Sequence, residues 1–450
     1  MENSSRFFEN RSCRYFPCHE GLADFNCLFC YCPLYALRPC PGTPTYKEKA
    51  GRLVKLCTGC TFPHRPENYE RVIALLRERK ESPRYGSYHH GGELSEAEGV
   101  SLDFSVNVNP LGVPAGVQTA LAALLSQSKP DSARAALARY PDASCGKLRA
   151  ALAEKRAVDA VDKERILCGN GASELIALLV AAVNPKSALL LAPSFSGYER
   201  ALCSRGVAVS YHFLRREESF ALRLSPEALL AGKPDMLFLC NPQNPVGNVI
   251  EPSLLEGIAD ACEERHIFLV VDECFLGFVT GGEARSLLRL VPDHPHLIVI
   301  DAFTKLYAIP SLRLGYAVTS NAMLLQKMRA LQPEWSVSLP AQIAGLAALA
   351  EDDYVVQSRH LVAGERAYLS RELSSLGFTV YEGEANFVFF SSINMDDLDL
   401  YQQLLEMGLL IRSCADFRGL SGCDYRIAVR KHEDNEVLIK AIKEIRKKHV

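Results

Sequence analysis

The stretch that decides the fold is DAFTKLYAIPSLRLGY, residues 301–316. Lys305 stands just after an apolar run, and Arg313 follows eight residues later, with an apolar segment and a proline between them. A lysine at the end of a strand is ordinarily a surface residue whose aliphatic stem lies along apolar neighbours. The pair therefore indicates chemistry only if other strand ends carry polar residues that could share a site with it.

Short apolar runs alternate with helical segments on both sides of this stretch. The alternation predicts a mostly parallel sheet with helices on both faces. The last 100 or so residues differ, because a long helical stretch over about 352–376 leads into short strands, which predicts a second, α+β domain. The apolar runs lie within the segments ERILCGN, SALLLAP, DMLFLCNP, HIFLVVDE and HLIVIDAFT.

Polar residues stand at the ends of four of these predicted strands. CGNGASE (168–174) is a glycine-rich turn that enters a helix, so its backbone N–H groups and Ser173 could hold a phosphate. Asn244 lies in NPQNPVGN, Asp272 ends VVDE, and Lys305 ends AFTK. Each has an ordinary structural explanation when taken alone. In an open α/β sheet, however, ligands bind at the carboxyl ends of the strands.

In this order and spacing the residues resemble the fold type I family of pyridoxal 5'-phosphate (PLP) enzymes, over residues from about 86 to 450. The resemblance implies a PLP domain over 83–450, with a large part at about 113–350 and a small part from about 83–112 and 351–450. It also implies a homodimer with active sites at the subunit interface.

The resemblance assigns a role to each of these residues. Lys305 would bind the cofactor aldehyde covalently, Asp272 would keep the pyridine nitrogen protonated, and Asn244 would hydrogen-bond the ring hydroxyl. Phe195, in APSFSGY, would stack on the ring. The cofactor phosphate would be held by Ala172, Ser173, Thr304 and Arg313, and by Tyr140 of the neighbouring subunit.

Within the fold type, the chain is similar to threonine-phosphate decarboxylases and to histidinol-phosphate aminotransferases. In both families one arginine grips the substrate carboxylate, here Arg426, and another grips the substrate phosphate, here Arg412. His90 and Asn107 match further substrate-binding positions. The segment 89–112, the string IRSCADFRGL and Phe275, which stands where the aminotransferases carry a tyrosine, favour the decarboxylase.

The expected reaction is the decarboxylation of O-phospho-L-threonine to aminopropanol phosphate for the cobamide nucleotide loop. O-phospho-L-serine, which would give ethanolamine phosphate, is the second candidate, because the two substrates differ by one methyl group, worth only about 1–3 kcal/mol in a pocket. An aminotransferase of the histidinol-phosphate type is the alternative. A weaker alternative is a partner-binding protein with a relic PLP domain.

Composition excludes several other classes of protein. The 450 residues carry a net charge of −3, so the whole chain does not favour nucleic-acid binding. No apolar run is long enough to span a bilayer, and the polar start lacks the apolar core of a signal peptide. Eight cysteines are scattered singly, mostly in apolar settings, which indicates a reducing, cytoplasmic compartment.

The other eight cysteines fall within the first 60 residues and need a separate explanation. They include two CxxC pairs, Cys27 with Cys30 and Cys57 with Cys60, and His64 follows the second pair. Paired thiolates at this spacing are typical of structural metal sites, and the metal supplies folding energy that so small a segment lacks. Zinc is expected, with an iron–sulfur cluster as the alternative. The candidate ligands are Cys13, Cys18, Cys27, Cys30, Cys32, Cys40, Cys57 and Cys60.

Residues 1–82 are therefore expected to form a metal-binding module outside the common decarboxylase architecture. Helical periodicity over 68–80 predicts a helix that closes the module. Residues 1–84 hold 14 Lys and Arg against 9 Asp and Glu, which could serve nucleic acid but more simply indicates a solvated surface. A protein partner of the module is the further expectation.

Overall fold

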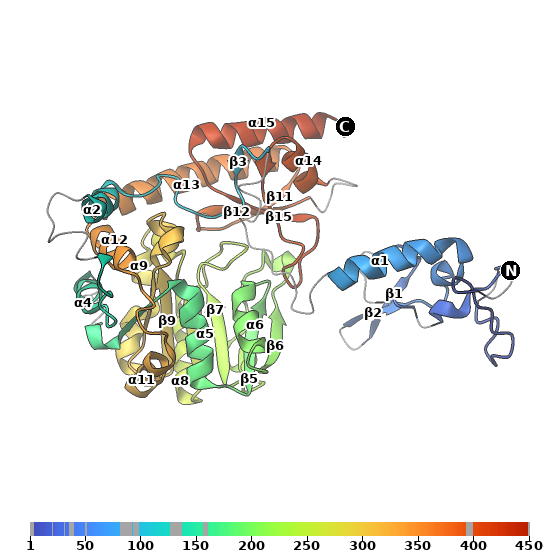
Figure 1. The fold of residues 1–450 in the computed structure, drawn as a ribbon, viewed down its shortest axis with the longest axis horizontal. Helices are drawn as coiled ribbons and strands as arrows, with labels where there is room; N and C mark the ends of the chain where they lie inside the picture. The colour runs from blue at the N-terminus through green and yellow to red at the C-terminus, as the bar shows by residue number, and fades with distance from the viewer. Residues whose placement is uncertain are drawn as a thin grey trace. The chain divides into compact units, whose positions relative to one another are not determined.

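The computed structural model of the chain divides into two compact units, Met1–Tyr88 and His89–Val450 (Figure 1). The structure describes residues 4–19, 21–30, 32–35, 40–49, 52–81, 92, 99–126, 137–155, 161–392 and 399–448. Each unit is built around its own buried residues. Among the helices that the structure describes, none is both long enough and apolar enough to cross a membrane.

The described residues of the first unit form a hairpin and an α-helix. Strands β1 (Thr45–Lys49) and β2 (Arg52–Leu56) pair antiparallel, with Thr45 opposite Leu56. The helix α1 (Tyr69–Glu81) lies where the periodicity predicts it. Short 3-10 helices complete the unit: η1 (Cys27–Phe29), η2 (Phe62–His64) and η3 (Pro66–Asn68).

The second unit is dominated by a seven-stranded mixed sheet in the order β4-β10-β9-β8-β7-β5-β6. Strands β5 to β9 run parallel to one another, whereas β10 runs antiparallel to both β4 and β9. The predicted α/β sheet is thereby confirmed. The strands are β4 (Ile166–Gly169), β5 (Ser187–Ala192), β6 (Ala208–Phe213), β7 (Met236–Cys240), β8 (Phe268–Asp272), β9 (Leu297–Ala302) and β10 (Gly315–Val318).

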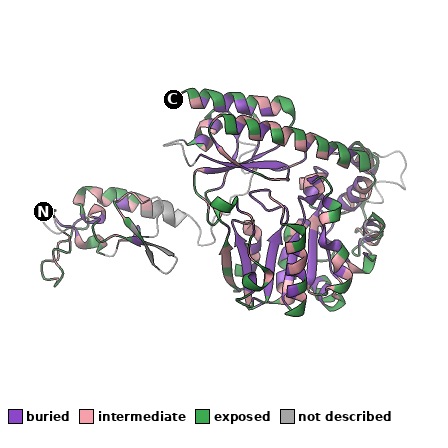
Figure 2. Ribbon diagram, turned by 180° about the vertical axis from the view of Figure 1, so that it is seen from behind, coloured by how far each residue is buried: buried purple, intermediate pink, exposed green. Residues whose placement is uncertain are grey.

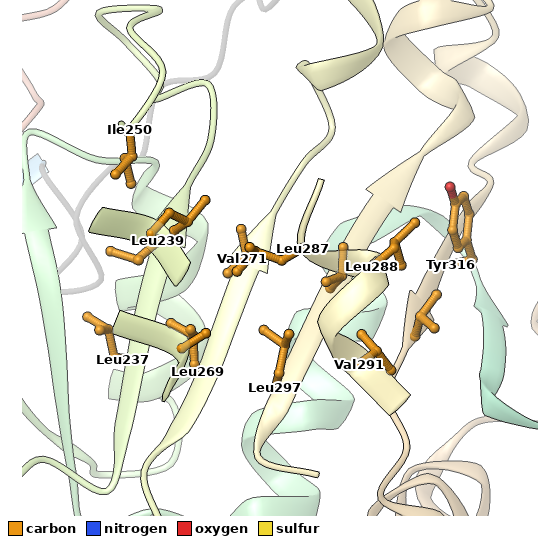
Figure 3. Packing of buried hydrophobic residues seen from close by; sticks show 14 of the residues in the cluster. Leu237, Leu239, Ile250, Leu269, Val271, Leu287, Leu288, Val291, Leu297 and Tyr316 are labelled. Atoms are coloured by element: carbon orange, nitrogen blue, oxygen red, sulfur yellow. The ribbon is translucent and has the colours of Figure 1, made fainter. Parts of the chain in front are cut away.

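Helices cover both faces of this sheet because successive side chains of each strand point to opposite faces. On one face, Leu237, Leu269 and Leu297 lie side by side (Figure 3). They belong to one core with residues of α4 (Gly146–Lys155), α8 (Pro252–Glu264) and α12 (Leu339–Leu349). On the other face, Met236, Val270 and Ile298 pack against α5 (Gly171–Val183), α6 (Ser196–Cys203) and α11 (Ala322–Leu331). Figure 2 shows the central strands buried between these layers.

The C-terminal part forms a second layer around a four-stranded antiparallel sheet, β11-β12-β15-β14. Strand β3 (Leu102–Asp103) pairs in parallel with β13 (Leu409–Leu410), so residues near 102 join this part of the chain. The remaining elements there are β11 (Thr379–Tyr381), β12 (Phe387–Ser391), β14 (Arg412–Ser413), β15 (Asp424–Ala428), α13 (Asp352–Ser375), α14 (Leu400–Glu406) and α15 (His432–Lys448).

Shorter elements connect these layers, and α10 (Phe303–Leu306) follows β9 directly. The others are α2 (Ala115–Leu125), η5 (Lys163–Arg165), η6 (Arg216–Glu218), α7 (Pro226–Leu229), η7 (Leu276–Phe278), α9 (Gly282–Arg285), η8 (Leu287–Asp293) and η9 (Pro310–Leu312).

Candidate functional site

Lys305 and Arg313 line one cavity of about 300 Å³ in the second unit. Lys305 is held in α10, immediately after the buried strand β9. Burial, together with the positive charges of Arg426 and Arg313, lowers the pKa of Lys305 to about 8. A sizeable fraction of this amine is therefore neutral near physiological pH, which a nucleophilic lysine requires.

Asp272 ends the parallel strand β8 and is 7% exposed. The phenol of Tyr198 donates a hydrogen bond to Asp272 Oδ2 at 2.6 Å, and the Cys274 N–H donates to Oδ1 at 3.0 Å. The two hydrogen bonds fix both carboxylate oxygens in place. Burial and the Asp272 charge raise the pKa of Tyr198, so its phenol keeps its proton and remains a donor. Asp272 can therefore hold a protonated ring nitrogen.

The N-terminus of α5 forms an anion cradle with Arg313. Gly171 has φ +74°, and a Cβ built there would lie 2.8 Å from Arg313 Nη2. A Cβ on Gly315 would lie 2.8 Å from the backbone nitrogen of Ala172. Only glycine fits at these two positions, and Ala172, Ser173 and Arg313 line the same cavity. This arrangement suits a phosphate at a helix N-terminus.

Arg426 lies in β15 and is 6% exposed. Its Nη1 donates to Asn244 Oδ1, and its Nη2 donates to the Ser105 carbonyl at 3.1 Å. With the Asn107 amide turned so that its oxygen faces the guanidinium, that oxygen accepts from Nη1 and Nε at 3.2 Å. Burial lowers the pKa of Arg426 to about 10, which leaves it charged at neutral pH.

Arg412 lines the same cavity but already has an acidic partner. Its Nη2 donates to Asp416 Oδ1 at 2.9 Å and to Oδ2 at 2.7 Å, and its Nη1 donates to the Ser413 carbonyl at 2.7 Å. The ring of Phe417 lies under the guanidinium, with its centroid 5.2 Å from Cζ. An anion that binds Arg412 must therefore share it with Asp416.

The structure brings together most of the residues that the sequence singled out. Two do not join them. Tyr140 is 76% exposed and stacks on Trp335, and His90 lies outside the described residues. Tyr198 and Asp416 were not among the predicted residues, although Tyr198 follows Phe195 by three residues and Asp416 follows Arg412 by four. The cavity is lined by Asn107, Ala172, Ser173, Phe195, Asn244, Asp272, Thr304, Lys305, Arg313, Arg412 and Arg426.

A second cavity, of about 440 Å³, lies within the first unit. Seven of the eight clustered cysteines line it, with Cys40 the exception, and His19 and His64 line it too. Burial and the nearby thiols of Cys30, Cys27 and Cys13 raise the pKa of Cys18. Burial and the thiols of Cys57, Cys40 and Cys60 do the same for Cys32.

The cysteines thus fall into two groups of four, so that the two CxxC pairs lie in different groups. The first group is Cys13, Cys18, Cys27 and Cys30, and the second is Cys32, Cys40, Cys57 and Cys60. The group Cys32, Cys40, Cys57 and Cys60 gathers at the open end of the β1–β2 hairpin. The segment after Cys32 is held near strand β2 because Lys55 Nζ donates to the Leu34 and Tyr35 carbonyls at 3.2 and 3.0 Å. The Thr43 N–H donates to Cys60 Sγ at 3.3 Å, as the N–H groups around metal-bound thiolates do.

Two family models match the chain. The one described as Aminotransferase class I and II covers residues 100–442, and the one described as Cysteine-rich small domain covers residues 4–85.

Individual relatives give the same picture. The threonine-phosphate decarboxylase of Salmonella typhimurium is 37% identical, over 79% of this chain and 96% of that protein. The histidinol-phosphate aminotransferase of Moorella thermoacetica is 30% identical, over 68% of this chain and 78% of that protein. The crystal structure of the histidinol-phosphate aminotransferase from Clostridium acetobutylicum has a TM-score of 0.70 at 28% identity, and the match covers 77% of this chain and 99% of that one.

Proposed function

The chain belongs to the class I and II aminotransferase family of fold type I, preceded by a cysteine-rich small domain, and on this premise we propose that it decarboxylates O-phospho-L-threonine. The observation that carries the proposal is the 37% identity to a threonine-phosphate decarboxylase across 96% of that relative. The product would be aminopropanol phosphate, the precursor of the cobamide nucleotide loop. O-phospho-L-serine, giving ethanolamine phosphate, is the second candidate substrate.

PLP is the cofactor that these residues fit. The α5 cradle with Ala172, Ser173, Thr304 and Arg313 would hold the phosphate, and Lys305 supplies the partly neutral amine for the covalent bond. Asp272 would face the ring nitrogen, Asn244 the ring hydroxyl and Phe195 the ring face. Bound PLP withdraws electrons from the substrate Cα, and the protein supplies orientation and charge. Tyr140 would reach the cofactor phosphate of a partner subunit in a homodimer.

The substrate would be held through its two anionic ends. Arg426 suits the α-carboxylate, because Asn107, Asn244 and Ser105 fix its guanidinium in the cavity wall. Arg412, with His90, would receive the phosphate. Holding the carboxylate at a fixed angle to the cofactor ring selects which Cα bond breaks. Lys305 or water would then return a proton to Cα.

Phe275 favours decarboxylation over transamination. It is buried and packs edge-on against Phe387, with the ring centroids 5.1 Å apart. The aminotransferases of this group carry at this place a tyrosine that helps to hold the ring hydroxyl. The cavity wall here is apolar instead.

A histidinol-phosphate aminotransferase is the second candidate function. The similarity to the structure from Clostridium acetobutylicum favours it. A relic PLP domain in a partner-binding protein is the weakest candidate, since eleven of the chosen residues line one cavity.

One experiment separates these functions: product analysis of purified protein with PLP and each substrate. Carbon dioxide and aminopropanol phosphate from phosphothreonine, with no keto acid added, are expected. Stoichiometric glutamate from histidinol phosphate and 2-oxoglutarate would reverse the ranking. No turnover of either substrate would favour the relic.

For the first unit, we propose a structural metal site, with zinc as the expected metal and an iron–sulfur cluster as the alternative. The unit holds eight thiols, seven of which line one cavity, and few buried apolar residues, and both observations support this. A protein partner that docks on this unit remains part of the proposal.

A further inference from the structure

Three residues of the first unit place possible metal-binding atoms close together. The Sγ of Cys18 and one ring nitrogen each of His19 and His64 all lie within 4.8 Å of one another. Neutral imidazole and thiolate are the ligands that zinc prefers in four-coordinate sites. The two histidines therefore extend the candidate ligand set beyond the eight cysteines.

His64 is prepared for this role by its hydrogen bonding. The side chain is buried, and its Nδ1 lies 3.0 Å from the Asn26 carbonyl oxygen. A carbonyl can only accept, so Nδ1 carries the hydrogen and the lone pair of the neutral ring is on Nε2. Among the described residues, Nε2 has no hydrogen-bond partner. A ligating histidine has this same arrangement, with the other ring nitrogen bonded to a carbonyl.

Asn26 in turn is fixed from several directions. Its backbone N–H donates to the His64 carbonyl at 2.8 Å, which closes a two-way link between the residues. Its side-chain oxygen accepts from the Phe8 and Leu28 N–H groups at 3.1 and 3.2 Å, and its amide donates to the Arg6 carbonyl at 2.9 Å. Asn26 is fully buried. The imidazole orientation is therefore set by the backbone around it.

Aromatic packing holds the ring in the same position. Phe25 stacks on His64 with centroids 4.6 Å apart and an interplanar angle of 24°. His19 meets His64 edge-on, with centroids 4.7 Å apart at 85°. Held in this way, His64 lines the same cavity as the cysteines.

We propose that Cys18, His19 and His64 form a mixed cysteine–histidine zinc site, with His64 binding through Nε2 and Cys30 supplying the fourth ligand. Cys30 follows η1, which Asn26 caps, and its thiol lines the same cavity. The group Cys32, Cys40, Cys57 and Cys60 is left for a site of thiolates alone. This inference rests on the proposal that the first unit binds metal, and it favours zinc over a cluster.

The first test needs no variant. X-ray absorption at the zinc edge of the full-length protein should give about two zinc ions per chain and a first shell averaging about three sulfurs at about 2.3 Å and one nitrogen at about 2.0 Å. Metal content without any nitrogen shell would overturn the mixed site and leave the metal-binding proposal standing. Full-length protein that binds no zinc, cobalt or iron would overturn both.

Variants make the test specific to His64. His64→Gln should lose one of the two zinc ions and keep the other, whereas Cys57→Ser should lose the other ion. Because a buried substitution can disrupt folding, His64→Cys provides the check: it should restore two ions, and with cobalt(II) as the probe its thiolate charge-transfer band should become stronger than in the parent protein. His64→Gln protein with two ions and an unchanged cobalt spectrum would overturn the inference.

Discussion

The phenol of Tyr198 lies 2.6 Å from Asp272 Oδ2 and donates a hydrogen bond to it, although the two residues come from α6 and from the end of β8. Tyr198 is fully buried, and its ring stacks on Phe238 of β7 with centroids 5.0 Å apart. The sheet core therefore sets the position of the donor. Hydrogen bonding to the ionised form of a carboxylate keeps that form stable, and an ionised Asp272 is what the proposed cofactor chemistry needs.

Replacing Tyr198 by phenylalanine should remove one hydrogen bond to the Asp272 carboxylate and leave PLP in its site. A hydrogen bond to a charged group contributes about 1.5–3 kcal/mol, so kcat/KM should fall about 10-fold or more while PLP occupancy stays near normal. Tyr211→Phe is the matched control, since Tyr211 does not line the cavity. An unchanged kcat/KM in Tyr198→Phe would show that Tyr198 only packs.

The lowered pKa of Lys305 predicts how the apoprotein captures PLP. Below a pH of about 8 the amine is mostly protonated and cannot attack, so the capture rate should rise with pH and level off above that value. After burial, the charge of Arg426 is the largest cause of the lowering. Arg426→Met should therefore move the midpoint upward, toward the ordinary lysine value of about 10.4.

Absorbance of the bound cofactor follows this reaction, and borohydride fixes it to the chain. Lys305→Ala should show no borohydride-stable link. Arg289→Met is the control, because Arg289 pairs with Glu256 and does not line the cavity. An Arg426→Met midpoint equal to that of the parent protein would contradict the electrostatic argument.

Asp416 predicts an unusual response at the phosphate end of the site. Its carboxylate lies 2.7 Å from the Arg412 guanidinium and competes with any incoming anion. Asp416→Asn should therefore strengthen inhibition by inorganic phosphate and lower the KM for phosphothreonine, each several-fold. Weaker phosphate inhibition in Asp416→Asn would show that Asp416 mainly orients Arg412.

Arg412→Gln and Arg426→Gln should each lower kcat/KM on the order of 100-fold with PLP retained.

The sequence predicted much of this site for a physical reason. Parallel strands end at one edge of a sheet, and Asn244, Asp272 and Lys305 each follow an apolar run. We therefore expect these three residues to lie close together. The sequence does not indicate that β10 runs antiparallel, because a four-residue buried strand has the same apolar pattern in a parallel and in an antiparallel sheet. The Tyr198–Asp272 bond and the Arg412–Asp416 pair depend on which side chains face each other after folding.

The cysteines illustrate the same limit. Spacing alone would assign the two CxxC pairs to one metal site. In the structure, the hairpin and the Asn26 hydrogen bonds place the two pairs in separate groups. His64 follows the second pair in sequence but lies near Cys18, a member of the first group. Such grouping comes from backbone contacts between residues far apart in the chain, which no local pattern records.

Metal removal should unfold the first unit and leave the second unit folded. The first unit buries few apolar side chains among its described residues, notably Phe7, Phe25, Leu34 and Val72, which is too little to offset the entropy of ordering the unit. The second unit has its own extensive core and a complete cofactor cavity. Chelation, or Cys30→Ser combined with Cys57→Ser, should therefore unfold the first unit and leave PLP binding largely intact.

Hydrogen exchange on the full-length protein measures both halves of this prediction at once. Amides of the hairpin β1–β2 and of Asn26 should lose their protection, while those of β7 and β8 keep theirs and the PLP absorbance is unchanged. Cys203→Ser is the control, since Cys203 is an exposed thiol of the second unit. A metal-free first unit that keeps its protection, with all eight thiols titratable, would mean that its few buried side chains and the Asn26 hydrogen bonds suffice to fold it. The eight cysteines would then need an explanation other than a structural metal.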